Sequence, residues 1–328
     1  MAAIPGTGPL VMDRSGLAKG SLDGEVAVVT GGGGNIGLGV ARSLAWLGAK
    51  VVIPEVSADF GKPAAALINE ENGPGTALFV ETDVSDEASM KEMAAQAFDA
   101  FGKVDILVNN AMAMSLAGPI LDSTVAQLDR QYEIAARGTF LGIRQFIPGM
   151  QARHHGVITY MTTSFCYPMG PSNYSAAKAA ATSIIMSLAF ELGPYEKTGI
   201  SVFTFLPAGI GFPKSGRVPA PKPGETPKFK MPPMPGYEGS VPPEDGGAAF
   251  AYCVAHAPEL HGSGVMVHQV LRHMDWAFPR PKTVRDTEFD RIDDTALALI
   301  FGYMGTGLPD PKVTLRPLER QTKTDPRS

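Results

Sequence analysis

Short apolar runs alternate with longer, alanine-rich segments between residue 25 and about residue 267. The apolar runs are rich in β-branched residues and too short for helices, so each one predicts a strand that is buried on both faces. The predicted strands cover residues 26–30, 51–53, 77–80, 106–108, 157–161, 202–206 and 265–267. The segments between them predict helices near residues 36–48, 58–71, 87–101, 123–150, 173–192 and 244–256.

The regular alternation of strands and helices indicates that the strands pair in parallel through right-handed crossover connections. The predicted fold class is therefore α/β, with a doubly wound parallel sheet in a single domain over residues 22–275. Residues 1–21 and 276–328 are predicted to be extensions at the two ends of that domain.

Two segments interrupt the alternation of strands and helices. Residues 212–243 contain ten prolines, too many for a helix or a central strand, so residues 208–243 are predicted to form a lid over a substrate site. In the C-terminal extension, residues 293–304 begin with acidic side chains and continue as an apolar run. This pattern predicts a short helix that packs on the protein or on a neighbouring subunit.

Charge and cysteine content exclude several classes of protein. The net charge is −5 with both signs interspersed, which differs from the basic surface of a nucleic-acid binder. Cys166 and Cys253 form neither a disulfide framework nor a spacing typical of a metal site, so no metal is predicted. The chain has no stretch of 18 apolar residues and no signal-peptide pattern, so we expect a soluble, cytoplasmic protein without a membrane-spanning helix.

A glycine-rich turn follows the first predicted strand and opens the first predicted helix. Glycines allow the backbone to turn sharply and to approach a pyrophosphate, which is then bound at the N-terminus of the helix. Asn35 stands where a glycine would be usual, and asparagine is the residue after glycine that best tolerates a positive φ. The turn therefore predicts a Rossmann-type dinucleotide site with contacts from Gly31, Gly34, Asn35, Ile36 and Gly37.

Glu55 ends the second predicted strand, 18 positions after Gly37. A carboxylate at this place accepts hydrogen bonds from the adenosine ribose and repels a 2′-phosphate, so NAD is predicted rather than NADP. The alternative is a solvated glutamate at a strand end.

Polar residues also follow the third and fourth predicted strands. Asp83 precedes Val84, and Asn109 and Asn110 precede Ala111. Open α/β sheets bind ligands at the carboxyl ends of their strands, so Asp83, Val84, Asn109 and Ala111 are candidate cofactor contacts. Aspartate and asparagine can equally serve as structural caps of strands and turns.

Tyr174 and Lys178 begin an alanine-rich helix with a spacing that places both side chains on one face. An ammonium group beside a tyrosine stabilises the phenolate and lowers its pKa, which allows proton transfer closer to neutral pH. Taken alone, this pair could be an ordinary contact on the helix surface.

The order of these motifs resembles the short-chain dehydrogenase/reductase family, in its single-domain branch, from Leu22 to about Val270. The resemblance implies that Tyr174 is the general acid/base and that Lys178 holds the nicotinamide ribose and tunes the tyrosine. It also places Pro207 in the cofactor site and requires a hydroxyl that orients the reacting oxygen. Position along the strand favours Thr163 for that hydroxyl, whereas residue type favours Ser164, which we prefer.

Besides Asn35, three positions depart from the family pattern. Ala135 replaces an asparagine that takes part in a proton relay, Met112 replaces a glycine, and Ala208 replaces another glycine. Such departures bear on catalysis more than on the fold or the cofactor.

The resemblance implies an NAD(H)-dependent oxidoreductase that interconverts a secondary alcohol and a ketone, assembled as a homodimer or homotetramer. Apolar side chains after predicted strand ends favour a hydrophobic or cyclic substrate, namely Met112, Met114, Phe165, Tyr167 and Met169. Two alternatives remain open: a lyase or isomerase on the same fold, and a catalytically idle NAD-binding subunit of a hetero-oligomer.

Overall fold

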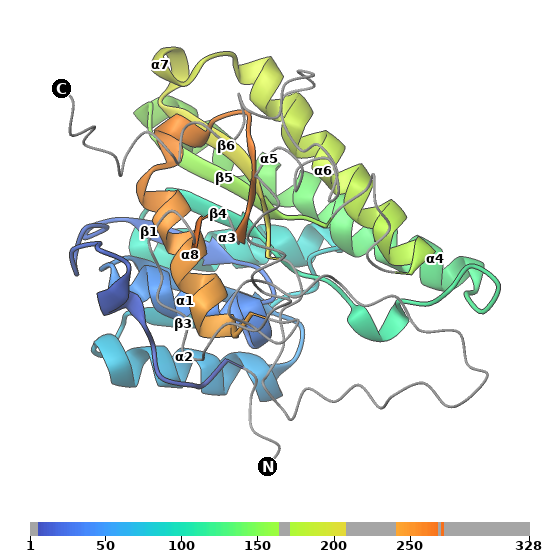
Figure 1. Ribbon diagram of the computed structural model, residues 1–328, viewed down its shortest axis with the longest axis horizontal. Coiled ribbons are helices and arrows are strands. Elements are labelled where there is room, and N and C mark those ends of the chain that lie inside the picture. Colours follow the sequence, from blue (N-terminus) through green and yellow to red (C-terminus); the bar gives the residue numbers. More distant parts are fainter. Residues whose placement is uncertain (1–5, 164–170, 208–240, 268–269, 272–328) are drawn as a thin grey trace, which may run out of the picture.

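The computed structural model describes residues 6–163, 171–207, 241–267 and 270–271 (Figure 1). It contains a seven-stranded sheet with the strand order β3-β2-β1-β4-β5-β6-β7, in which all neighbouring strands are parallel. The strands are β1 (Val26–Val29), β2 (Lys50–Glu55), β3 (Ala77–Glu81), β4 (Ile106–Asn109), β5 (Gly156–Met161), β6 (Ile200–Leu206) and β7 (Gly264–Met266). The predicted doubly wound parallel sheet is therefore confirmed.

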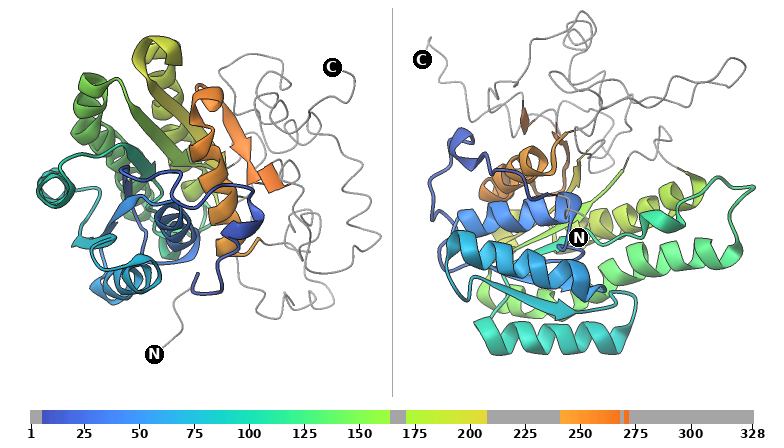
Figure 2. Two further views of the ribbon diagram at one scale, coloured as in Figure 1. Left: turned by 90° about the vertical axis from the view of Figure 1, so that its left-hand side faces the viewer. Right: turned by 90° about the horizontal axis from the view of Figure 1, so that it is seen from below.

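Helices cover both faces of the sheet (Figures 1 and 2). One face carries α1 (Asn35–Trp46), α2 (Ala58–Asn72) and α8 (Pro243–Ala255). The other face carries α3 (Glu87–Phe101), α5 (Gly138–Arg153) and α6 (Ser172–Leu192). Alternate residues of each strand enter the two cores, since Ala27 and Val29 face the first layer while Val26 and Val28 face the second.

The helix predicted near residues 123–150 runs without a gap from Val125 to Arg153, but it changes its hydrogen-bonding type on the way. It comprises α4 (Val125–Tyr132), a π-helical turn η3 (Glu133–Arg137) and α5. A π turn inserts one extra residue without breaking the apolar pattern, so periodicity did not reveal it. Shorter elements also escaped prediction because one turn carries no measurable period: α7 (Tyr195–Thr198), η1 (Met12–Arg14), η2 (Met114–Leu116) and η4 (Ala257–Leu260).

The backbones of α1 and α8 are in direct contact. A Cβ atom on Gly39 would lie 2.0 Å from the Pro243 carbonyl oxygen, and one on Gly247 would lie 2.3 Å from the Gly39 carbonyl. Only glycine fits at these two positions without movement of one helix. The helix that begins at the glycine-rich turn is thereby locked against the helix that follows residues 208–240.

A buried arginine ties the start of the described chain to this pair of helices. Arg42 of α1 donates to the carbonyl oxygens of Gly6 (2.7 Å) and Gly8 (2.8 Å) and to both carboxylate oxygens of Glu71. Glu244 of α8 accepts from the Gly8 backbone N–H at 2.6 Å. Residues 6–8 are therefore held against α1 and α8.

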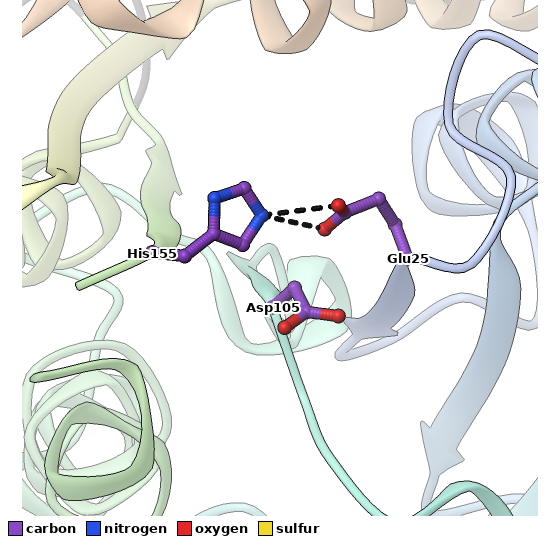
Figure 3. A group of neighbouring side chains, drawn as sticks. All are labelled: Glu25, Asp105 and His155. Atoms are coloured by element: carbon purple, nitrogen blue, oxygen red, sulfur yellow. Dashed lines mark hydrogen bonds and ion pairs between the residues drawn. The ribbon is translucent and has the colours of Figure 1, made fainter. Parts of the chain in front are cut away.

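At the amino edge of the sheet, charged side chains join the starts of three strands (Figure 3). His155 Nε2 lies 2.9 Å from Glu25 Oε2, and the buried carboxylate of Asp105 pairs with Arg153 (3.0 Å) and with Lys103 (2.8 Å). Glu25, Asp105 and His155 lie close enough to share a metal ion. Because two cationic side chains already compensate Asp105, we assign this cluster to holding the sheet edge.

Within the described residues, α6 is the one helix long and apolar enough to cross a membrane, judged by length and composition. The sequence did not predict it as a span because Lys178 and several hydroxyl groups interrupt the apolar run. It packs against α4 and β6 and carries the buried Lys178, as a core helix does. The remaining predictions, for a lid at residues 208–243 and a helix at residues 293–304, fall outside the described residues apart from residues 241–243.

Candidate active site

The glycine-rich turn after β1 adopts the conformations that its residues suggest. Gly31 has φ +65° and Asn35 has φ 49°, so asparagine does take a left-handed conformation where glycine is usual. A Cβ atom on Gly37 would lie 2.3 Å from the Gly31 carbonyl oxygen and 2.6 Å from Asn110 Nδ2. No larger residue fits at position 37 while the turn keeps this shape.

The N-terminus of α1 suits an anion. Its first turn contains no acidic side chain, and Gly34 at the N-cap supplies no side-chain hydrogen bond to the first N–H groups. Such N–H groups and the helix dipole together favour a negatively charged ligand. Gly34, Asn35, Ile36 and Gly37 therefore fit a pyrophosphate, as a nicotinamide dinucleotide would present.

Glu55 at the end of β2 lies against the glycine-rich turn. A Cβ atom on Gly33 would lie 2.9 Å from Glu55 Oε2, and Glu55 Oε1 accepts a long hydrogen bond of 3.4 Å from the Ser57 N–H. The carboxylate is partly exposed and is not paired with a cation by any ion pair of the described residues. The turn predicted to bind the pyrophosphate and the carboxylate predicted to bind the adenosine ribose therefore lie side by side.

The carboxylate of Asp83 is bound within the protein. It accepts hydrogen bonds from Arg130 of α4 (2.6 Å) and from the Ser85 hydroxyl (2.7 Å). Burial raises the pKa of Asp83, but the hydrogen bonds from Ser85 and Arg130 outweigh it and lower the pKa. This arrangement favours the structural alternative for the side chain of Asp83.

Asn110 holds the glycine-rich turn in place, a role that the sequence did not single out. Its Nδ2 donates to the carbonyl oxygens of Thr30 (2.9 Å) and Gly31 (3.2 Å). Thr30 Oγ1 in turn accepts from the N–H groups of Asn110 and Ala111. The neighbouring Asn109 instead donates to the Thr159 carbonyl oxygen (3.0 Å) and joins β4 to β5.

A cavity of about 10 Å³ lies beside this turn. Its lining residues are Thr30, Val84, Asn109, Ala111, Ile134, Gly138 and Thr139. A volume of this size holds about one water molecule. Three predicted cofactor residues, Val84, Asn109 and Ala111, therefore share one small space with the π turn η3.

Tyr174 lies in the first turn of α6 beside the end of β5. Burial raises the pKa of Tyr174 to about 12, and hydrogen bonding with the Thr163 side chain lowers it in part. Thr163 is buried and follows β5 by two positions. Ser164, which residue type favoured as the orienting hydroxyl, lies outside the described residues.

Lys178 lies one turn after Tyr174 and is buried. Its Nζ donates to the Met161 carbonyl oxygen at 2.6 Å and lies 5.8 Å from the centroid of the Tyr174 ring. Burial lowers the pKa of Lys178 to about 7. The pKa of Tyr174 is therefore raised overall, not lowered as predicted, because burial is the largest cause of the shift in both groups.

Asn173 links Tyr174 to the segment after β4. Its Oδ1 accepts from the N–H groups of Gly118 (3.0 Å) and Tyr174 (2.7 Å), while its Nδ2 donates to the Leu116 carbonyl oxygen (2.8 Å) and the Ser123 hydroxyl (3.2 Å). This buried amide uses its full hydrogen-bonding capacity. Sequence spacing gave no signal for it, since its partners lie 50 to 57 positions earlier.

We expect Asn173→Ala to raise KM for the carbonyl substrate about tenfold, with NADH affinity changed less than threefold. Loss of about 1–3 kcal/mol from unpaired buried groups would release residues 116–123 from the start of α6. Steady-state kinetics and NADH fluorescence titration measure the two effects. Asn72→Ala is the matched control, because Asn72 donates only to its own helix at Ile68. An unchanged KM in Asn173→Ala would contradict this role.

The remaining residues that the sequence analysis named differ in position and in burial. Ala135 lies buried in η3, and Pro207 follows β6 at the carboxyl edge of the sheet, partly buried. Met114 is 60% exposed, so it is not an ordinary core residue. Phe165, Tyr167 and Met169 lie outside the described residues.

Comparison with known proteins gives a consistent set of relatives. Residues 25–218 match the sequence model of the family described as short chain dehydrogenase. A trans-4-hydroxycyclohexanecarboxylate dehydrogenase of Sinomonas cyclohexanicum is 32% identical over 216 residues, which are 62% of this chain and 81% of that protein. A 2,5-dichloro-2,5-cyclohexadiene-1,4-diol dehydrogenase of Sphingobium indicum is 31% identical over 200 residues, which are 60% of this chain and 78% of that protein.

A solved structure shares the same architecture. The 3-ketoacyl-(acyl-carrier-protein) reductase from Brucella melitensis, complexed with NADH, is similar with a TM-score of 0.63 and 29% sequence identity. The match covers 75% of this chain and 98% of that chain. The similarity thus extends over most of the described fold.

Proposed function

Because this chain belongs to the short chain dehydrogenase family, we propose that it is an oxidoreductase that uses NAD(H) to interconvert a secondary alcohol and a ketone. One observation carries the proposal. The side chains of Thr163, Tyr174 and Lys178 meet at the carboxyl edge of a parallel sheet whose glycine-rich turn fits a pyrophosphate. The NADH bound to the similar reductase from Brucella melitensis supports the choice of a nicotinamide cofactor.

When bound, the nicotinamide supplies or accepts the hydride at the carbinol carbon. In the reducing direction the Tyr174 hydroxyl donates its proton to the substrate oxygen, and in the oxidising direction the phenolate takes the proton back. The Thr163 hydroxyl, hydrogen-bonded to Tyr174, is placed to orient that oxygen. The Lys178 ammonium group would hold the nicotinamide ribose and stabilise negative charge on Tyr174.

The burial of Tyr174 favours its protonated, acid form. Burial raises its pKa to about 12, so the hydroxyl keeps its proton at neutral pH and is ready to act as an acid. In the oxidising direction the same burial must be overcome before the phenolate can form.

We propose a hydrophobic, cyclic substrate. Two similar proteins are named for acting on cyclohexane and cyclohexadiene derivatives. In this chain, the segment that Asn173 holds beside Tyr174 carries the exposed apolar side chains Met114, Ile120 and Leu121. Apolar groups beside a few polar ones suit such a ring.

A titration with NADH, followed by a panel of cyclic ketones monitored through NADH absorbance, tests the proposal. Turnover of at least one cyclic ketone is the expected result. NADH binding without turnover across the panel would favour an idle NAD-binding subunit, and NADH-independent loss of substrate would favour a lyase or isomerase. Ala135 and Met112 motivate the idle-subunit alternative, since both replace residues that the family pattern contains.

For cofactor choice we expect a preference for NADH over NADPH of about tenfold or more. Glu55 presents a carboxylate to the glycine-rich turn where a 2′-phosphate would lie, and like charges repel. Glu55→Gln, which keeps the shape and removes the charge, should reduce the preference. Glu70→Gln on α2 is the control. Comparison of kcat/KM for the two cofactors measures the effect, and a wild-type preference for NADPH would refute the assignment of Glu55.

We also propose that the chain assembles with copies of itself, as a dimer or tetramer. Phe140 on α5 is 47% exposed and Phe190 on α6 is 89% exposed. Large apolar side chains on neighbouring helices commonly mark an interface in a symmetric oligomer. Sedimentation of the full chain gives the oligomeric state.

A further inference from the structure

The ammonium group of Lys178 lies between two tyrosine rings. Its Nζ is 4.8 Å from the centroid of the Tyr160 ring and 5.8 Å from that of the Tyr174 ring. The same atom donates to the Met161 carbonyl oxygen. The nearer ring therefore belongs to a residue that the proposed mechanism does not use.

Tyr160 is a core residue of β5. It is 1% exposed and belongs to the same buried cluster as Ala135 and Ala177. Its hydroxyl has no hydrogen-bond partner among the described residues. A buried hydroxyl without a partner opposes folding, so hydrogen bonding does not explain why this side chain lies here. The contact that Tyr160 makes with Lys178 is through the face of its aromatic ring.

That ring is uncharged at neutral pH. Burial, and then the charge of Tyr174, raise the pKa of Tyr160 well above its ordinary value. A neutral aromatic face attracts a cation within about 6 Å of its centroid, and the attraction is larger where water is excluded. The distance to Lys178 satisfies this condition.

Few other groups stabilise the charge on Lys178. The elements packed against α6 are α4, η3, α5, β5 and β6. In their described parts, Tyr160 of β5 is the titratable side chain that faces Nζ, with Tyr174 on α6 itself. Burial causes the shift in the pKa of Lys178, and no carboxylate of the described residues offsets the loss of water.

We propose that Tyr160 is a positioning residue whose ring face keeps Lys178 charged and directed toward Tyr174. The proposal rests on the proposed function, in which the ammonium form of Lys178 supports both cofactor binding and proton transfer. It predicts that loss of the Tyr160 ring changes the pKa of Lys178 and that loss of the Tyr160 hydroxyl does not. A ring that stabilises the charged form raises the pKa of Lys178 above the value that burial alone would give.

The test compares Tyr160→Phe, which keeps the ring, with Tyr160→Leu, which removes it. The pKa of Lys178 is measured by NMR on protein labelled with [ε-¹³C]lysine, with the signal assigned by its absence from Lys178→Arg. Tyr160→Phe should leave the pKa within a few tenths of a unit and keep or raise Tm. Tyr160→Leu should lower the pKa by about 0.5–1 unit. The pH above which NADH binding weakens should fall by the same amount.

If Tyr160→Leu does not fold, phenylalanines with one, two and three fluorines at position 160 provide the same test at nearly constant shape. Fluorine withdraws charge from the ring face, so the pKa of Lys178 should fall stepwise along this series. A pKa that stays constant or rises, in the Leu variant or along the series, overturns the proposal. The NMR measurement needs no substrate, so its result is distinguishable from a failure of wild-type protein to reduce any ketone.

Discussion

Tyr174→Phe is expected to lose turnover by at least about 10²-fold while NADH affinity changes less than threefold. The change removes the one hydroxyl placed to exchange a proton with the substrate oxygen, and general acid/base catalysis by a positioned side chain is worth roughly 10²–10⁴-fold. It adds no atoms and leaves the glycine-rich turn, Glu55 and Lys178 untouched. Kcat for the best ketone of the panel and NADH fluorescence titration measure the two quantities.

Tyr195→Phe is the matched control for this experiment. Tyr195 begins α7, after the far end of α6, and removal of its hydroxyl should leave kcat within a factor of two. Thr163→Val should reduce kcat less than Tyr174→Phe, since the Thr163 hydroxyl orients and does not transfer the proton. Turnover by Tyr174→Phe near the wild-type rate would rule out the proposed mechanism.

Arg42→Met is expected to have the largest effect on stability, a loss of about 3–5 kcal/mol in the free energy of unfolding. The Arg42 side chain is 3% exposed, and its removal leaves the Glu71 carboxylate and the carbonyl oxygens of Gly6 and Gly8 without their donor. For a domain of this size the corresponding fall in Tm is roughly 10 °C. Thermal unfolding of the protein without NADH measures it.

Two further variants distinguish the effect of this buried hydrogen-bond network from the effect of removing any positive charge. Lys91→Met breaks an exposed pair with Glu87, whose partners are 62% and 65% exposed, and should change stability by less than about 0.5 kcal/mol. The double variant Arg42→Met, Glu71→Met should recover part of the loss, because it also removes the Glu71 carboxylate that Arg42→Met leaves unpaired, whereas Glu244, 3.8 Å from Arg42, still loses its cationic partner. A Tm of Arg42→Met equal to that of wild type would show that residues 6–8 are not held by this network.

Much of the fold was predictable because it depends on patterns within a few residues. Strands buried on both faces require uninterrupted apolar runs, and the seven runs appear as the seven strands. The turn at Gly31–Gly37 was predictable for the same reason, since a positive φ at Gly31 and Asn35 is a property of those residue types. The π turn at η3 was missed because one extra residue hardly alters the apolar pattern.

The candidate site was predictable only where residue type and spacing carry the chemistry. A spacing of four places Tyr174 and Lys178 on one helix face, and the resemblance to the family gave them their roles; Glu55 follows from its place at a strand end. Their protonation did not follow, since Lys178 was expected to lower the pKa of Tyr174. Burial depends on what the rest of the chain places around a side chain, and here it dominates both groups.

By itself the sequence determined the class of fold, because local periodicity sets it. Residue type and the resemblance to the family then marked the glycine-rich turn and the Tyr174 and Lys178 pair as the candidate site. The tertiary structure alone decided the roles of Arg42, Asn110, Tyr160 and Asn173. Each acts on a partner from another element. Asn110 bonds to Thr30, 80 positions away, and Asn173 bonds to Leu116, 57 positions away. Tyr160 of β5 faces Lys178 of α6. Hydrogen bonds and ring contacts act over a few ångströms in space, and only the folded sheet brings such distant positions within that range.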